Sequence, residues 1–144
     1  MADDQIFNLK EALKLENLIT LHRDRFELRY SVDQDFDAIR GKIDEGALKS
    51  ELSEWAFITL SEQHPEEKAV VFLTGCRDGG MPIMTSYVQI IVFERMLVRT
   101  KSGSLYRLGD RAVTPLSADR VATIAGVFNT WGMGQMLGMP PVFF

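Results

Sequence analysis

Cys76 is the first residue whose type and position suggest chemistry. It is the only cysteine of the chain, and Arg77 follows it directly. A neighbouring cation lowers the pKa of a thiol and turns it into a nucleophile. A cysteine nucleophile also needs a positioned base, and the two histidines, His22 and His64, lie far away in the sequence. We therefore expect Cys76 to be a buried residue at a strand end, and we assign no catalytic residue.

Two short motifs resemble ligand loops but lack residues that such loops require. Aspartates alternate from Asp33 to Asp37, yet Ala38 and Asp44 stand where a calcium-binding EF-hand loop has glycine and glutamate. The Asp78–Gly80 turn has neither glycine pattern of a phosphate-binding loop. One cysteine and two histidines are too few for a four-ligand zinc site. We expect no metal and no cofactor.

Basic residues gather around a predicted hairpin in the second half of the chain. Bases interleaved with an aromatic ring on a sheet can bind single-stranded nucleic acid through phosphate contacts and base stacking. The net charge of the whole chain is −4, which opposes such binding, and a solvated sheet face explains the same residues. The candidate nucleic-acid contacts are Arg95, Arg99, Lys101, Tyr106, Arg107 and Arg111.

The end of the chain is unusually apolar. Residues 121–144 contain no charged side chain, and residues 131–144 are rich in methionine and glycine. Flexible methionine-rich surfaces adapt to apolar grooves on partner proteins. The alternative is that this tail folds back and completes the core of its own chain. The candidate partner surface consists of Trp131, Met133, Met136, Leu137, Met139, Phe143 and Phe144.

The first half of the chain predicts mainly helices. Apolar residues recur at helical spacing over residues 3–16, and strict alternation predicts a strand over 26–32. The S-x-x-Q pattern of Ser31–Gln34 resembles a capping box and predicts a helix over about 33–45. Residues 47–62 fit either a helix or a strand, and we favour a helix to about 54 followed by a strand over 55–60.

The second half predicts an antiparallel meander over about 69–109. Four β-rich runs are separated by turns, and Ser102-Gly103 reads as a two-residue hairpin in which Arg99 faces Tyr106 and Lys101 faces Ser104. Ser117 can cap a closing helix that extends to about residue 130. Runs of helix around one meander predict an α+β fold, with helices mainly from the N-terminal half and one C-terminal helix. We expect a single domain over 1–144.

Composition places the protein among ordinary globular domains. The chain has 144 residues, 46% of them hydrophobic and 25% charged. The first 68 residues carry a net charge of −7 and the remainder a net charge of +3. The acidic N-terminus has no secretory pattern, and a single cysteine allows no internal disulfide, so we expect a cytoplasmic protein.

The functional expectation is a non-enzymatic protein-interaction or regulatory module that self-associates, as a homodimer. Its partner is another protein or a second copy, and nucleic-acid binding through the basic hairpin is the alternative. A membrane span is not expected, because four glycines and the pair Pro140-Pro141 interrupt the uncharged C-terminal stretch.

Gly103→Val is expected to destabilise the protein by more than about 1 kcal/mol. A tight hairpin turn requires a positive φ at this position, which glycine adopts without a Cβ clash. Thermal melts of the variant and the wild type measure the effect, and identical melting temperatures would show that the turn lies elsewhere.

Overall fold

The computed structural model describes residues 13–44, 46–63 and 68–140. Within these ranges the helices are α2 (Ala118–Thr130), α3 (Met133–Met136) and four single 3₁₀ turns, η1 (Leu15–Asn17), η2 (Asp33–Phe36), η3 (Asp78–Gly80) and η4 (Phe93–Arg95). The strands are β1 (Phe26–Tyr30), β2 (Leu48–Glu62), β3 (Lys68–Arg77), β4 (Met81–Val92), β5 (Leu97–Thr100) and β6 (Leu105–Leu108).

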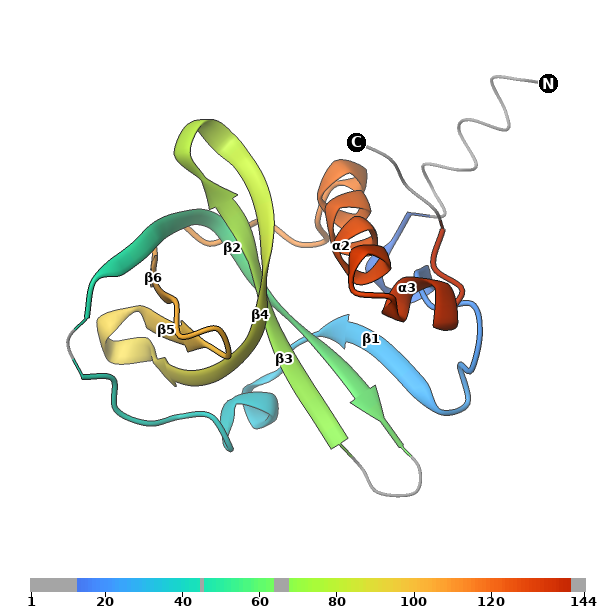
Figure 1. Ribbon diagram of the computed structural model, residues 1–144, viewed down its shortest axis with the longest axis horizontal. Coiled ribbons are helices and arrows are strands. Elements are labelled where there is room, and N and C mark those ends of the chain that lie inside the picture. Colours follow the sequence, from blue (N-terminus) through green and yellow to red (C-terminus); the bar gives the residue numbers. More distant parts are fainter. Residues whose placement is uncertain (1–12, 45, 64–67, 141–144) are drawn as a thin grey trace.

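Strands β2 to β6 form a closed five-stranded mixed barrel. Each strand is antiparallel to the next, and β6 then returns to pair in parallel with the first half of β2. The second half of β2 extends beyond the barrel and pairs on the same side with β1. Figure 1 shows the barrel on the left, the extension formed by β1, β2 and β3 below, and α2 and α3 on the right.

The β2–β3 pair is buried on both faces and separates two apolar cores. Side chains such as Trp55, Phe57 and Leu73 point into the barrel. Their neighbours Ile58 and Phe72 point to the other side, where α2, α3 and residues 15–19 cover the sheet. Burial on both faces explains why these strands read as continuous apolar runs rather than alternating ones.

The fold-class prediction is wrong, because the protein is a β-barrel and not a set of helices packed on an open meander. The helix expected over 33–45 is only the single turn η2, and the rest of that segment wraps around the outside of the barrel. Ile43, for example, covers Leu97 and Leu105. The apolar residues of this segment have the spacing of a helix, but an extended chain places each of them against the barrel in turn.

Residues 48–54 are also strand, not helix, and a β-bulge explains the misleading spacing. The register of β2 against β3 shifts between Ser53 and Ala56, and Glu54 has a positive φ of 48°. The extra residue places both Leu52 and Trp55 inside the barrel, although they are three residues apart. A spacing of three in a bulged strand imitates one turn of a helix.

Other elements agree with the sequence to different degrees. The strand expected over 26–32 is β1, and the closing helix is α2, whose first turn is capped by Ser117 Oγ accepting from the amide of Arg120. The helix expected over 3–16 lies mostly outside the described residues. The register predicted for the β5–β6 hairpin is wrong by one residue, since Arg99 faces Leu105 and not Tyr106.

The hairpin loop therefore has three residues, Lys101 to Gly103. The amide of Gly103 donates to the carbonyl of Thr100 at 2.9 Å, and Gly103 has a φ of 87°. A three-residue loop of this kind ends in a residue with positive φ, so the requirement for glycine holds although the turn type differs.

The apolar tail packs against its own chain. The carbonyl of Leu137 accepts from the amides of Thr20 and Leu21, each at 3.0 Å, and Asn129 Nδ2 donates to the carbonyl of Pro140 at 3.1 Å. Leu137 and Met139 belong to the core that α2 covers. Within the described residues the tail thus completes the core in cis.

Leu137→Ala is expected to lower the free energy of unfolding by about 2–5 kcal/mol, because it empties a fully buried position. Met136→Ala is the matched control: its side chain is 49% exposed, and the change should stay within about 0.5 kcal/mol. Urea denaturation measures both variants. A small loss for Leu137→Ala would mean that the tail leaves its core site in solution.

Candidate functional site

The structure disperses the basic residues that were candidates for nucleic-acid contact. Arg95 Nη1 donates to the carbonyl of Ile43 at 3.0 Å, and Arg99 Nη2 donates to the carbonyl of Asp44 at 3.5 Å. Lys101 lies over the ring of Tyr87, at 5.3 Å from the ring centroid. Arg95 and Arg99 therefore hold residues 43–44 against the barrel, and Lys101 covers the ring of Tyr87.

Tyr106 has no access to a nucleobase. Its side chain points into the barrel, and the residue is only 8% exposed. Arg107, the next residue, is exposed on the opposite face of β6. Arg111 lies beyond β6 and stacks over Trp55, at 5.6 Å from the ring centroid. The hairpin therefore lacks the aromatic platform on which the nucleic-acid interpretation relied.

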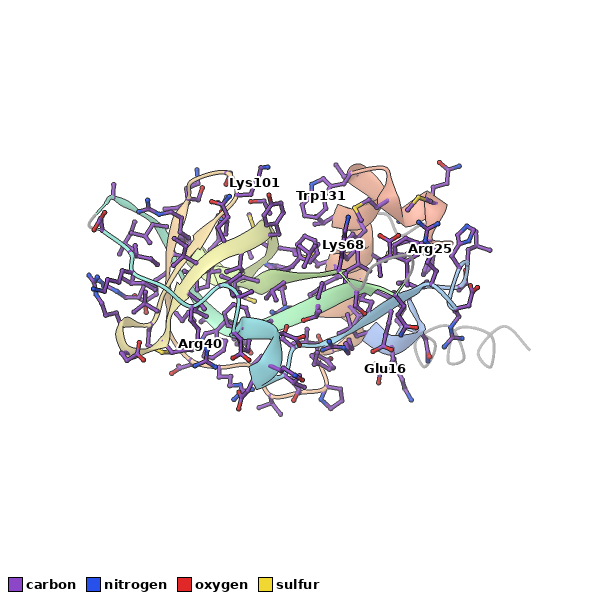
Figure 2. The ribbon with its side chains drawn as sticks, turned by 90° about the horizontal axis from the view of Figure 1, so that it is seen from below. Glu16, Arg25, Arg40, Lys68, Lys101 and Trp131 are labelled. Atoms are coloured by element: carbon purple, nitrogen blue, oxygen red, sulfur yellow. The ribbon has the colours of Figure 1, made fainter. Side chains whose placement is uncertain are left out.

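The candidate partner surface on the tail is divided by burial. Trp131 is 41% exposed and packs against Phe72 and Phe128. Figure 2 labels Trp131 beside the C-terminal helices. Met136 is exposed, Met133 is half-buried, and Leu137 and Met139 are buried. Phe143 and Phe144 lie outside the described residues. The exposed part is thus a small apolar surface around α3.

Cys76 is buried near the end of β3, as expected. Burial is the largest influence on its thiol and raises the pKa, while the nearby Arg120 acts in the opposite direction. A thiol with a raised pKa stays protonated and is a poor nucleophile. Asp78 to Gly80 form an exposed turn between β3 and β4.

η2 is fastened to the sheet by the carboxylate of Asp35. The two terminal nitrogens of Arg29 donate to its two oxygens at 2.6 and 2.9 Å. The amide of Val32 donates to the same group at 2.7 Å, and the hydroxyl of Thr59 donates at 3.1 Å. The hydrogen bond from Arg29 is the main cause that lowers the pKa of the Asp35 carboxyl, against the opposite effect of burial.

A groove runs along one side of η2, between the start of β3 and the end of β4. Its wider part has a volume of about 500 Å³ and an apolar lining that includes Ile39, Val71 and Val88. Its second part, of about 390 Å³, is polar and is lined by Glu27, Arg29, Gln34, Asp35, Ser61, Gln63 and Ala69. Asp35 and Ala69 line both parts, so the groove passes from a polar to an apolar end.

A separate, smaller pocket lies on the other side of η2. It has a volume of about 170 Å³, and none of its lining residues belongs to the groove. Four of the aromatic rings that line it are in edge-to-face contact with one another, with centroids 5.1 to 6.2 Å apart. These rings belong to Phe36, Trp55, Phe57 and Phe93.

Sequence reasoning missed the groove, the pocket and the role of Asp35. The aspartates that follow β1 are conspicuous in the sequence, but comparing them with a calcium-binding loop does not indicate that Asp35 holds η2 against the sheet. A usable signal was present in β1, because Arg29 lies on the polar face of that strand only six residues before Asp35. The groove itself depends on where β3 and β4 separate, which no local pattern indicates.

Comparison with known proteins leaves the site to be interpreted from its own geometry. No protein family, curated protein or solved structure matches the chain. Among the described residues there is no group of three or more histidine, cysteine, aspartate or glutamate side chains suited to a metal ion. In the same part of the chain, no helix is long and apolar enough to cross a membrane.

Asp35→Asn is expected to lower the free energy of unfolding at pH 7 by about 2 kcal/mol, because it weakens charge-assisted hydrogen bonds. The folded-state pKa lies below the unfolded value of about 3.9. The carboxylate therefore stabilises the fold fully above that value, and this contribution is lost as the pH falls through the folded-state pKa. The variant should lose less stability than the wild type between neutral and acidic pH.

Urea titrations at a series of pH values measure this difference. Asp37→Asn is the control. The carboxylate of Asp37 is exposed, and its ion pair with Arg40 Nε, at 3.8 Å, lies at the surface, where such pairs contribute little to stability. Equal losses of stability on acidification in the wild type and Asp35→Asn would contradict the anchoring role of Asp35.

Proposed function

We propose that the protein is a non-enzymatic binding module that takes an extended segment of a partner protein as an added strand on β3. The observation that supports this is the unpaired start of β3. Lys68 to Val71 pair with β2 on one side, whereas the pairing with β4 begins only at Phe72. The start of β3 is therefore a sheet edge, and it opens onto the groove.

The direction of the backbone groups identifies the residue that would receive the partner. The amide of Ser31 donates to the carbonyl of Phe57, and the amide of Gln63 donates to that of Arg25, so odd-numbered residues in this half of β2 face β1. Even-numbered residues then face β3, and their β3 partners are also even-numbered. Ala69 consequently turns its N–H and C=O away from β2, toward the groove.

The groove lining favours a particular kind of segment. A peptide added to a strand edge gains affinity from backbone hydrogen bonds and specificity from pockets for alternate side chains. The end near Ile39 and Val71 suits apolar side chains, and the end near Glu27 and Arg29 suits polar or charged ones. The proposed ligand is an extended segment with apolar residues at one end and charged residues at the other.

A second copy of the chain is the alternative occupant of this edge, and its binding there would be self-association. A strand edge can pair with the identical edge of a second copy about a two-fold axis. The described part of the tail packs on its own chain, which argues against a dimer in which two copies exchange their tails. The nucleic-acid alternative is not favoured, because Tyr106 is buried.

Ala69→Pro is expected to weaken peptide binding at least tenfold, or about 1.4 kcal/mol, because it removes the outward N–H from the edge. Proline is tolerated on sheet edges, so the fold should persist. Ala69→Ser keeps the amide and is the matched control. Linear peptides selected from a displayed library against the wild type provide the ligands, and fluorescence anisotropy measures their affinities.

Equal affinities of Ala69→Pro and Ala69→Ser for the selected peptides would refute strand addition at β3. Light scattering tests the alternative occupant. A wild-type dimer that becomes a monomer in Ala69→Pro would assign the edge to a second copy instead of a different partner.

A further inference from the structure

The small pocket lies where β2 changes neighbours along one edge. β6 pairs with β2 up to Leu52, and β1 pairs with it from Ile58 onward. Residues 110–112 extend the first partner only as far as Trp55, whose amide donates to the carbonyl of Asp110 and whose carbonyl accepts from Ala112. Between these partners the edge of β2 is uncovered, and the pocket of about 170 Å³ fills this interval.

The interval leaves one backbone donor without a backbone partner. The carbonyl of Phe57 accepts from the amide of Ser31 at 3.0 Å, so the N–H of Phe57 points to the same edge. After Ser31 the chain turns into η2, and within the described residues no backbone acceptor receives this N–H. A buried amide requires an acceptor, and here the space beside it belongs to the pocket.

Opposite charges also line the pocket without neutralising each other. The guanidinium of Arg111 stacks over Trp55, and the carboxylate of Asp33 comes from the first turn of η2. In the described part of the chain neither group forms an ion pair or a side-chain hydrogen bond. The aromatic rings that line the pocket provide an apolar surface beside these two charged groups. The pocket thus offers a cation, an anion, a free amide and an apolar surface.

We propose that this pocket binds a free α-amino acid with an apolar or aromatic side chain. The ligand carboxylate accepts from the Phe57 amide and from Arg111, and the ligand ammonium pairs with Asp33. The ligand side chain packs on the rings of Trp55 and Phe93. A simple carboxylic acid or a simple amine would leave one of the two protein charges unpaired.

The size of the pocket agrees with this ligand class. Pockets for drug-sized ligands usually measure roughly 300–1,000 Å³. A pocket of about 170 Å³ is too small for a nucleotide and is comparable with a single amino-acid residue. The site is independent of the proposed peptide groove, because the two share no lining residue.

The first test uses ligands that carry one or both charges. L-Phenylalanine and L-leucine are added to the full chain, with N-acetyl-L-phenylalanine and phenethylamine as analogues that lack the ammonium and the carboxylate, respectively. Fluorescence of Trp55 in a Trp131→Phe background reports occupancy, because Trp55 lines the pocket. Saturable quenching or enhancement by at least one amino acid, with both analogues at least tenfold weaker, is the expected result.

The second test assigns each charge to its partner. Asp33→Asn should weaken the binding of L-phenylalanine at least tenfold and leave the binding of N-acetyl-L-phenylalanine unchanged. Arg111→Gln should weaken L-phenylalanine likewise and leave phenethylamine unchanged. Asp37→Asn and Arg107→Gln, both at exposed positions outside the pocket, are the matched controls.

Absence of a saturable signal with either amino acid would overturn the proposal. So would equal affinity for an amino acid and its single-charge analogue, because the zwitterion would then not be recognised. Circular dichroism checks that each variant is folded, and if one is not, the comparison of ligands on the Trp131→Phe protein decides alone.

Discussion

The rest of the structure depends on the burial of β2 and β3 on both faces. Ile58 and Phe72 contribute to the core beneath α2, whereas Phe57 and Leu73 contribute to the core inside the barrel. Each strand thus contributes alternate side chains to the two cores. The β2–β3 pair is therefore a wall that both cores share. Because about 25 cal/mol is gained per square ångström of apolar surface buried, covering these strands on both sides contributes strongly to the stability of the fold.

The length of β2 leaves room for the small aromatic pocket, because neither β6 nor β1 alone covers the edge of β2 that they share. β2 has 15 residues, and β6 and β1 take successive parts of one edge. η2 lies across the barrel-side face near this junction, held by Asp35 and Arg29. The anchor places η2 so that one side borders the groove and the other borders the aromatic pocket. Two cavities of different chemistry therefore share a single structural support.

Local patterns predicted the elements that local chemistry determines. The Ser117 cap, the β1 alternation and the need for glycine at position 103 all depend on neighbours in sequence. The fold class could not be obtained in this way. Barrel closure joins Leu48 to Leu105, and the bulge at Glu54 gives a strand the spacing of a helix. Both effects arise from tertiary pairing, which overrides the periodicity of the sequence.

The candidate sites show the same division. The sequence draws attention to the basic hairpin and the apolar tail, because unusual composition is visible without a structure. Tyr106 and Leu137 then prove to be core residues. The unpaired edge at Ala69 has no compositional signal, since an alanine in a strand is unremarkable in any sequence. Its importance comes only from the point at which β4 leaves β3.

Parallel closure of the barrel also has a consequence for the order of folding. The β2–β3, β3–β4, β4–β5 and β5–β6 pairs are joined by short connections, so their contacts close small loops at a low entropic cost. The β2–β6 contact must wait until the whole chain between residues 48 and 108 is arranged. Topologies with such distant contacts fold slowly, because the entropy of closure is lost before the contact forms. We therefore expect the four hairpins to assemble first and the seam between β2 and β6 to close last, near the native side of the folding barrier.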